Sequence, residues 1–331
     1  MKVFITGISG FIGFHLALHL KKMGCEVHGC DNFTPYYSIS LKKAREEILK
    51  QENIIVRQAD IVRMNELKAI FEREAFDCLV HLAAQPGVRY SITHPDSYIQ
   101  TNIVGFYHIL EICRKYPAMK LIYASSSSVY GLNSKIPYAE KDKADKPASL
   151  YGATKKANEV IAYSYHHLYK IPMTGLRFFT VYGPWGRPDM AYYSFTKAIL
   201  EEKPIELYNY GNVRRDFTYV DDIVRGIYAA MQLEGNAEIF NLGNQRSEPV
   251  SRMIEILEDL LGKKAKIEMR PLAQGDVVET FADLSHSAKK LNFQPAFSLE
   301  EGLKHFVSWY KSYNKANASG KKSIRSVAIK Q

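Results

Sequence analysis

Lys2-Val3-Phe4-Ile5-Thr6-Gly7-Ile8-Ser9-Gly10-Phe11-Ile12-Gly13 is the stretch that decides the fold of this chain. The apolar run Lys2–Thr6 is typical of a buried β-strand, and three glycines follow it at once. Such glycines permit a tight turn, a close approach of the backbone and close packing of the next helix. A segment from about Phe11 to Met23 predicts a helix whose N-terminal amides suit a pyrophosphate. The stretch therefore predicts a dinucleotide-binding turn that uses Gly7, Gly10, Phe11, Ile12 and Gly13.

An acidic residue follows the second predicted strand, Glu26–Cys30. Asp31 lies about twenty residues after the glycine turn, where a carboxylate accepts hydrogen bonds from the adenosine ribose. The same carboxylate repels a 2′-phosphate, so the sequence favours NAD over NADP. The alternative is that Asp31 is only a turn residue before Asn32, and it fits the register less well.

Further apolar runs alternate with helical patterns along the chain. This alternation predicts an α/β fold with a doubly wound parallel sheet of the Rossmann type and a smaller mixed α/β lobe. The other predicted strands are Ile54–Gln58, Cys78–Leu82, Leu121–Ala124 and Thr174–Phe179. Ligands of such sheets bind at the carboxyl ends of the strands. We therefore expect one site at the sheet edge formed by Gly7, Asp31, Ala83, Ser126 and the segment after Phe178.

The predicted domains interleave along the chain. Residues 1–180 are expected to form mainly the NAD-binding domain, to which segments near 213–245 return. Residues 181–312 are expected to form mainly a nucleotide-sugar lobe, and 313–331 a basic flexible tail.

A serine run and a Tyr-x-x-x-Lys pair predict the chemistry. The strand Leu121–Ala124 is followed by Ser125–Ser128, and Tyr151 and Lys155 fall on one face of a later helix. A lysine cation beside a phenol favours the phenolate, so we expect the pKa of Tyr151 to lie below its usual value. With a serine hydroxyl, the pair predicts a proton shuttle for alcohol–ketone chemistry. A Tyr-x-x-x-Lys pair alone usually lies on the surface of a helix and has no catalytic role. The prediction therefore depends on the elements that precede the pair.

Composition excludes several other classes of function. The 331-residue chain has no apolar run as long as the roughly 18 residues of a membrane span, and its first residues enter a strand, so we expect neither a membrane segment nor a signal peptide. Four cysteines without ligand spacing predict reduced thiols in a cytoplasmic protein, and the histidine spacing predicts no metal. The net charge of +9 is concentrated near the C-terminus, where a solvated tail is favoured over nucleic-acid binding.

With these motifs the chain resembles the extended short-chain dehydrogenase/reductase family, and within it the nucleotide-sugar epimerases and dehydratases. The resemblance runs from Met1 to about Lys311 and includes Leu82-Ala83-Ala84 and the segment Arg215–Asp222. It implies a tightly held NAD that takes hydride from a UDP-sugar, whose 4-keto form rotates and receives the hydride on its other face. It implies Tyr151 as the base, Lys155 on the nicotinamide ribose and Ser126 on the C4 oxygen. The other residues expected at the cofactor are Asn32, Asp60, Ile61, Leu82, Ala83, Ala84, Gln85 and Asn102.

Three positions narrow the substrate within this family. Thr180 stands where galactose 4-epimerases usually carry asparagine, and Ser128 stands where UDP-glucuronate decarboxylases usually carry glutamate. The segment Gly183–Ala191 resembles the signature of the UDP-glucuronate 4-epimerases. The resemblance thus implies interconversion of UDP-glucuronate and UDP-galacturonate. Small hydroxyls on Ser127, Ser128 and Thr180 are expected to hold the sugar carboxylate and so to prevent loss of carbon dioxide.

Charged residues around the predicted substrate leave alternatives open. Arg187 is expected to recognise the carboxylate or, alternatively, to fix its own loop, and Arg89 to reach the carboxylate or the phosphates. By resemblance, Arg215 and Asp276 flank the UDP moiety, and Asp216 fixes a loop. Trp185 is equally compatible with packing and with stacking, and His81 is expected to be a core residue.

Other functions remain as alternatives to this prediction. Within the enzymes they are a UDP-glucose or UDP-N-acetylglucosamine 4-epimerase, then a UDP-glucuronate decarboxylase. A non-catalytic NAD-binding regulator would have lost the Ser/Tyr/Lys set, which is intact here. The resemblance also implies a homodimer through the helices that hold Asn102–Cys113 and Tyr151–Tyr169.

Overall fold

A seven-stranded parallel sheet forms the centre of the structure, a computed structural model that describes residues 1–234 and 237–318. The spatial order of its strands is β11-β6-β5-β4-β1-β2-β3. Their bounds are β1 Lys2–Thr6, β2 Glu26–Asp31, β3 Ile55–Gln58, β4 Cys78–His81, β5 Lys120–Ser126, β6 Met173–Phe178 and β11 Glu238–Leu242. The strand order reverses beside β1, which pairs with both β2 and β4, and this is where such sheets bind ligands. The predicted fold class is confirmed.

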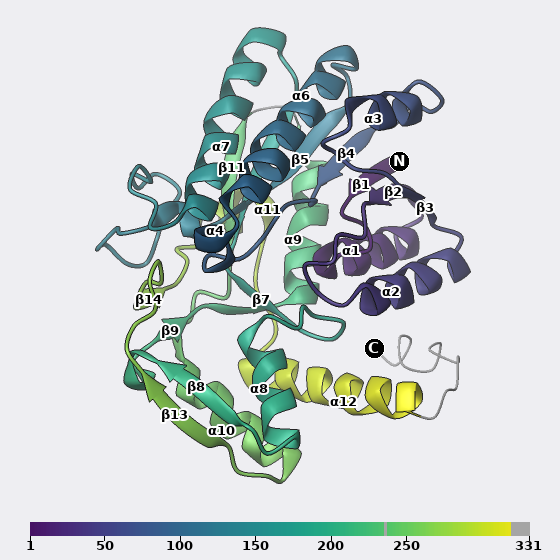
Figure 1. Ribbon diagram of the computed structural model, residues 1–331. Coiled ribbons are helices and arrows are strands. Elements are labelled where there is room, and N and C mark those ends of the chain that lie inside the picture. Colours follow the sequence, from purple (N-terminus) through teal and green to yellow (C-terminus); the bar gives the residue numbers. More distant parts are fainter. Residues whose placement is uncertain (235–236, 319–331) are drawn as a thin grey trace.

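Helices cover both faces of the sheet (Figure 1). On one face lie α1 Phe11–Lys22, α2 Ile39–Gln51, α9 Val220–Gln232 and α11 Ser285–Leu291. The other face carries α3 Met64–Phe71, α6 Phe106–Lys115 and α7 Leu150–Tyr169. Directly before α6, the chain forms α4 Tyr90–Thr93, α5 Pro95–Tyr98 and the π-helix η1 Ile99–Gly105. Apolar side chains of β1 alternate between these two layers: Val3 and Ile5 pack on the first, and Phe4 on the second.

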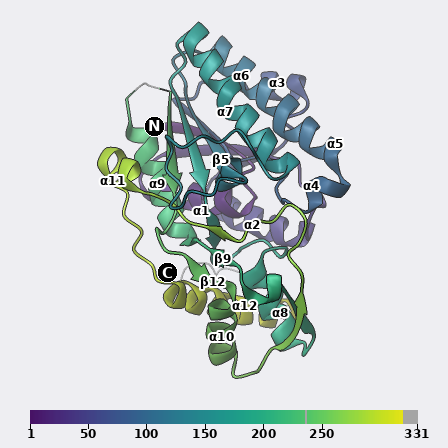
Figure 2. The same ribbon diagram turned by 90° about the vertical axis from the view of Figure 1, so that its left-hand side faces the viewer.

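A smaller lobe lies below the sheet in Figure 1 and is also visible in the turned view of Figure 2. Its strands are β8 Pro204–Tyr208, β9 Arg214–Arg215, β12 Glu248–Pro249, β13 Lys266–Arg270 and β14 Glu279–Thr280. Its helices are α8 Ala191–Leu200, α10 Val250–Leu261 and α12 Leu299–Ala318, and the 3₁₀ turns of the chain are η2 Ser127–Tyr130 and η3 Asn209–Gly211. After β8 and β9 the chain returns to the sheet, because β11 pairs with β6.

The structure corrects two details of the sequence prediction. Residues 180–182, predicted as part of a loop, form strand β7 Thr180–Tyr182, which pairs in parallel with β10 Phe217–Tyr219. Residues 313–318 of the predicted flexible tail belong to α12, where Tyr313 is buried and stacks on Trp309. The rest of that prediction, 319–331, lies outside the described residues. Within the described part of the chain, no helix has the length and apolar character needed to cross a bilayer.

Candidate active site

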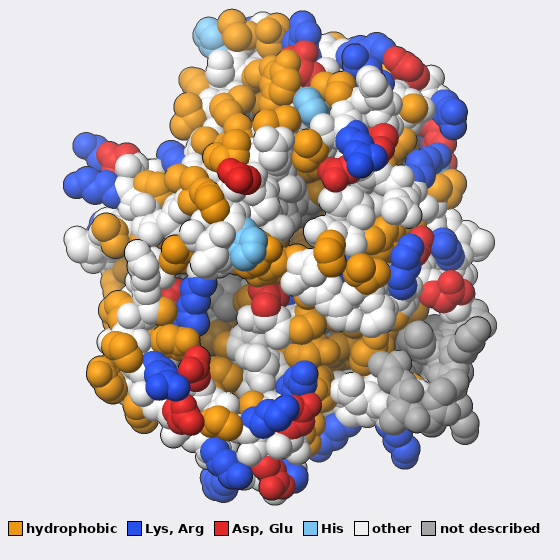
Figure 3. Space-filling view, viewed as in Figure 1, with side chains coloured by type: hydrophobic (Ala, Val, Ile, Leu, Met, Phe, Trp, Pro, Cys, Tyr) orange, Lys and Arg blue, Asp and Glu red, His pale blue; other side chains and the backbone are white. Residues whose placement is uncertain are grey.

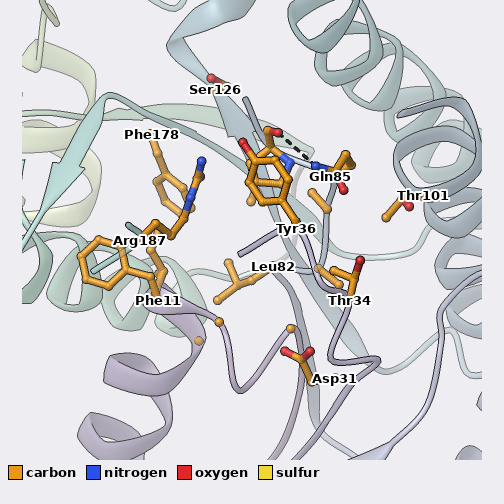
Figure 4. A pocket seen from close by; sticks show the side chains of 18 of the residues that line it. Phe11, Asp31, Thr34, Tyr36, Leu82, Gln85, Thr101, Ser126, Phe178 and Arg187 are labelled. Carbon is orange, nitrogen blue, oxygen red and sulfur yellow. Dashed lines mark hydrogen bonds between the residues drawn. The ribbon is translucent and has the colours of Figure 1, made fainter. Parts of the chain in front are cut away.

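Two adjoining cavities open at the carboxyl ends of the sheet strands. The first lies over the glycine turn and the second lies between the sheet and the lobe. Ser126, Tyr151 and Arg187 line both cavities, and Figure 4 shows Ser126 and Arg187 at the first one. The end of β5, the start of α7 and the loop before α8 therefore converge at the junction.

The glycine turn leaves no room for side chains. A Cβ on Gly13 would lie 2.3 Å from the carbonyl oxygen of Gly7, and Gly7 itself has a φ of +71°. The backbone of α1 consequently approaches β1 closely, and the N-terminal amides of α1 open into the first cavity. The turn thus has the close backbone approach that the predicted pyrophosphate site requires.

Asp31 is buried at the end of β2 with one of its two oxygens occupied. Oδ1 accepts a hydrogen bond from the backbone amide of Phe33 at 2.8 Å and lies 3.7 Å from Nζ of Lys42. Oδ2 has no hydrogen-bond partner among the described residues, so it is available to a ribose hydroxyl. Figure 4 shows the carboxylate at the cavity, below Thr34.

Most residues predicted at the cofactor line the first cavity. They are Gly7, Gly10, Phe11, Ile12, Gly13, Asp31, Asn32, Ile61, Leu82, Ala83, Ala84, Gln85, Tyr151 and Lys155. Sequence reasoning missed Thr34, Tyr36, Tyr37, Lys42 and Thr101, which also line it. These five residues lie on the loop after β2, at the start of α2 and in the π-helix η1. No sequence motif marks them.

Two predicted cofactor residues do not line the cavity. Asp60 accepts hydrogen bonds from Asn32 Nδ2 at 3.1 Å and from the amide of Val62 at 3.0 Å, so it fixes the loop behind the cavity. Asn102 accepts from the amide of Gln85 at 2.8 Å and donates to Thr154 Oγ1 at 3.1 Å. Asn102 is buried between α7 and the loop that follows β4, and its hydrogen bonds hold the two together.

The catalytic candidates meet at the junction of the cavities. Lys155 Nζ donates a hydrogen bond of 2.9 Å to the carbonyl oxygen of Ala124, at the end of β5. Burial lowers the pKa of Lys155 to about 8. Ser126 Oγ lies 3.1 Å from Ser128 Oγ and accepts from the Ser128 amide at 3.1 Å.

The structure corrects the prediction for the pKa of Tyr151. Burial raises this pKa above its ordinary value, whereas a hydrogen bond with Ser126 and the charge of Arg187 lower it. Burial outweighs both, because the phenol is enclosed and loses the hydration that a phenolate needs. The groups that lower the pKa are Ser126 and Arg187, and the lysine four residues on does not reverse the sign.

A buried ion pair supports the serine run from below. Arg177 on β6 contacts both oxygens of Glu159 on α7 at 2.8 Å, and Ser125 Oγ donates to the same carboxylate at 2.6 Å. Ser149 caps α7 by accepting from the amide of Gly152 at 3.1 Å. These contacts fix β5 and α7 relative to each other, and with them the serine run and Tyr151.

The second cavity carries the residues predicted for the substrate. Ser126, Ser127, Ser128, Thr180, Arg187, Arg215 and Asp276 line it. Arg89 is not among the lining residues: its guanidinium donates to Asp276 Oδ2 at 2.7 Å and lies 3.9 Å from the ring centroid of Tyr208. It therefore sits at the rim, bound to a residue of the wall.

Three residues with open or structural predictions are settled by their contacts. Asp216 accepts from the amides of Asn244 and Ala282 and from Thr218 Oγ1, so it fixes a loop. Trp185 is buried and packs on Phe14 and Trp309, which favours packing over stacking on a ligand. His81 is a core residue whose Nδ1 lies 2.8 Å from Thr6 Oγ1.

Comparisons with known proteins agree with this arrangement. Residues 3–243 match the NAD dependent epimerase/dehydratase family. UDP-glucuronate 4-epimerase 4 of Arabidopsis thaliana is 48% identical over 329 residues, which cover 94% of this chain and 75% of the plant protein.

Solved structures add two similar proteins. UDP-glucuronic acid 4-epimerase from Bacillus cereus, in complex with UDP-glucuronic acid and NAD, is 35% identical, with a TM-score of 0.88 and coverage of 95% of this chain and 100% of that chain. UDP-glucose 4-epimerase from Thermotoga maritima, with UDP-glucose, is 31% identical, with a TM-score of 0.87 and the same coverage.

Proposed function

Because this chain belongs to the NAD dependent epimerase/dehydratase family, we propose that it is a UDP-glucuronate 4-epimerase, which interconverts UDP-glucuronate and UDP-galacturonate. The observation that carries the proposal is the second cavity, which is lined by two different groups of side chains. At its junction with the cofactor cavity stand Ser126 and Tyr151, and beyond them stand the hydroxyls of Ser127, Ser128 and Thr180. The first group suits oxidation of an alcohol, and the second suits a carboxylate.

Bound NAD would supply the acceptor for a hydride from C4 of the sugar and the donor for its return to the opposite face. Gly7, Gly10 and Gly13 make room for its pyrophosphate, and Asp31 Oδ2 is available to its adenosine ribose. A carboxylate at this position favours NAD over NADP, as the sequence predicted. Lys155, which lines the same cavity, is the residue that we place on the nicotinamide ribose.

Tyr151 is the proposed base for the C4 hydroxyl. As hydride leaves C4, the phenolate oxygen takes the hydroxyl proton, and it returns this proton when the ketone is reduced. Ser126, which is hydrogen-bonded with Tyr151, is proposed to hold the C4 oxygen during both steps. Arg187 lowers the pKa of the tyrosine and so supports its basic form.

The carboxylate is proposed to be held by hydroxyl donors. In a 4-keto acid the bond from C5 to the carboxylate can break, which releases carbon dioxide and sends the electrons of that bond into the ketone as an enolate. A proton then adds to C5. Loss of carbon dioxide needs that bond perpendicular to the ring. Donors from Ser127, Ser128 and Thr180 would fix the carboxylate in another orientation without an opposing negative charge. Arg215 and Asp276, in the same cavity, are proposed for the UDP moiety.

Assembly and location are further parts of the proposal. Exposed apolar side chains on α6 and α7, among them Tyr107, Val160 and Tyr163, support a homodimer through these helices. All four cysteines are free and buried, which supports a cytoplasmic location.

The test of the proposed activity uses the purified protein with UDP-glucuronate and no added cofactor, followed by proton NMR of the anomeric region. We expect a steady mixture with UDP-galacturonate, which also requires that NAD is already bound. UDP-xylose or a UDP-4-keto-pentose as the main product would identify a decarboxylase. No change, with turnover of UDP-glucose instead, would move the assignment to the neutral-sugar epimerases.

A further inference from the structure

Arg187 is held by residues from two different parts of the chain. Its Nε donates to Asp189 Oδ1 at 3.0 Å, and its Nη2 contacts Asp189 Oδ2. Tyr36, on the loop after β2, donates from its hydroxyl to Asp189 Oδ2 at 3.0 Å. Figure 4 shows Tyr36 and Arg187 at the same cavity, with Arg187 beside Phe178. The carboxylate of Asp189 thus connects the loop after β2, which carries Tyr36, to the guanidinium of Arg187.

This contact leaves one end of the guanidinium unused. Asp189 takes Nε and Nη2, and among the described residues Nη1 has no hydrogen-bond partner. Arg187 lines both cavities, and its side chain is 21% exposed. An arginine held from one side in this way presents its free N–H groups in a fixed direction.

The loop that carries Arg187 does not depend on Asp189 for its own shape. Arg45, fully buried on α2, donates to the carbonyl oxygens of Trp185 and Gly186. His15 on α1 contacts the carbonyl oxygen of Pro184 at 2.8 Å. The backbone before Arg187 is therefore fixed by α1 and α2, and Asp189 acts on the side chain of Arg187.

We propose that Asp189 is a positioning residue that holds Arg187 with Nη1 free for the substrate carboxylate and offsets its charge, while Tyr36 ties the pair to the cofactor side. This rests on the proposed function, because it assigns the direction of Arg187 to an acidic sugar. Without Asp189 the guanidinium would rotate, and the carboxylate would lose a fixed partner. Without the counter-charge, Arg187 would act more strongly on Tyr151.

The charged and titratable groups around Tyr151 are few. They are Lys155 on its own helix, Tyr98 on α5 with its ring 6.2 Å away, Tyr36 after β2, and Arg187 and Asp189 before α8. Tyr151 must lose a proton to act as a base, so kcat rises with pH through its pKa. Removal of the negative charge of Asp189 lowers that pKa, and the acid limb of the profile then moves to lower pH.

The experiment compares four variants of the NAD-bound enzyme with UDP-glucuronate. Asp189→Asn removes the charge, Asp189→Glu restores it, and Tyr36→Phe removes only the hydroxyl. Glu255→Gln, on the exposed surface of α10, is the matched carboxylate-to-amide control. For each we measure the pH dependence of kcat and the ratio of UDP-4-keto-pentose to UDP-galacturonate.

We expect Asp189→Asn to raise that ratio several-fold and to move the acid limb down by roughly half a pH unit. In Asp189→Glu the acid limb of the kcat profile should return toward that of the wild type. Tyr36→Phe should raise KM and leave the acid limb where it is. An unchanged ratio and limb in Asp189→Asn would overturn the proposal. If Asp189→Asn does not fold, a Tyr36→Phe enzyme with the KM of the wild type would overturn it. A wild-type enzyme that makes no UDP-galacturonate would instead refute the proposed function.

Discussion

At Tyr151, opposing effects act on one phenol. Burial raises its pKa, and a hydrogen bond with Ser126 and the charge of Arg187 lower it. The same burial lowers the pKa of Lys155 to about 8. A phenol whose pKa is raised by burial loses its proton more readily when one more positive charge comes near. The oxidised nicotinamide ring of NAD carries such a charge, so burial here suits a site that works only when loaded.

The hydroxyl clamp gives a prediction at two residues. Thr180→Ala and Ser128→Ala each remove one proposed donor to the carboxylate, so the 4-keto acid should lose carbon dioxide more often. We expect a UDP-4-keto-pentose to appear in both, and more of it in the double variant, as measured by NMR of the products. Variants that bind UDP-glucuronate normally and release no keto-pentose would refute the clamp.

Lys155 gives a prediction about stability and pH. Its pKa in the folded protein, about 8, lies below its ordinary value near 10.5, so folding disfavours the charged form. This cost is fully present below pH 8 and disappears as the pH rises toward 10.5. After allowance for the lost hydrogen bond to Ala124, Lys155→Met should stabilise the NAD-free protein at pH 7 by about 1–2 kcal/mol.

The measurement is the free energy of unfolding in urea, for the wild type and Lys155→Met, between pH 7 and 10. The advantage of the variant should shrink steadily above pH 8, while its epimerase activity is lost. An advantage that grows with pH would show that the sign is wrong.

At the scale of elements, β5, β6 and α7 are joined by the ion pair of Arg177 and Glu159. The pair is almost fully buried, with side chains 2% and 1% exposed, and each oxygen of Glu159 accepts from Arg177. Removing Arg177 from such a pair leaves a buried carboxylate whose remaining charged partner is the partly exposed Lys156, 3.0 Å away. Ser125 of the serine run donates to Glu159, and Tyr151 lies on the same helix as Glu159. The geometry of the serine run and of the first turn of α7 therefore depends on the ion pair.

We expect Arg177→Met to lower the free energy of unfolding by about 3–5 kcal/mol, as measured by denaturant titration. Replacing both residues, in Arg177→Met/Glu159→Met, should recover part of this loss, because no charge then remains buried. Arg252→Met, which removes an exposed pair on α10, should change stability by less than about 1 kcal/mol. A loss in Arg177→Met no larger than in this control would contradict the role of the pair.

Period and spacing were enough to predict the elements of the sheet. The strands and most helices begin and end close to their predicted bounds, because most strands of the sheet are short, mainly apolar runs between polar turns. The π-helix η1 was read as ordinary helix, since its sequence has no signal for the wider turn. Strand β7 was missed because only three residues pair, and they pair with β10, which lies far along the chain.

The candidate site was predicted where a motif marks it and missed where only the fold assembles it. The glycine turn, Asp31 and the Ser/Tyr/Lys set follow from spacing. Tyr36, on the loop after β2, and Lys42, in the first turn of α2, line the cofactor cavity only because the fold brings them there. Asn102 and Asp60 were placed at the cofactor, yet their side chains bond to backbone behind it.

At the scale of the whole molecule, the two cavities depend on the contact between sheet and lobe. Arg89 comes from the sheet side and binds Asp276 of the lobe, and Tyr36 comes from the sheet side and binds Asp189. Asp276 lines the substrate cavity, and Tyr36 lines the cofactor cavity. The lobe is thus held to the sheet by two pairs that each have one member in a cavity wall, which ties ligand binding to the fit between the two parts.

The last prediction concerns the proposed homodimer. Val160 and Tyr163 on α7 are 60% and 65% exposed, and Tyr107 on α6 is 46% exposed. Figure 3 shows hydrophobic side chains gathered over these two helices at the top of the molecule. A stable interface buries about 1,200–2,000 Å² in total, and a face of two helices from each copy provides that area. Charges placed in its centre would lose their hydration without gaining a partner.

We therefore expect Val160→Glu/Tyr163→Glu to convert the dimer into monomers, as measured by sedimentation equilibrium at micromolar concentration. Met269→Glu, which puts the same charge on the exposed strand β13 of the lobe, is the control and should leave the dimer intact. A wild-type protein that sediments as a monomer would refute the homodimer, and a double variant that stays dimeric would place the interface elsewhere. Because Tyr151 and Lys155 lie on the same helix as Val160 and Tyr163, the monomer should also show how far packing of α7 in the dimer contributes to kcat.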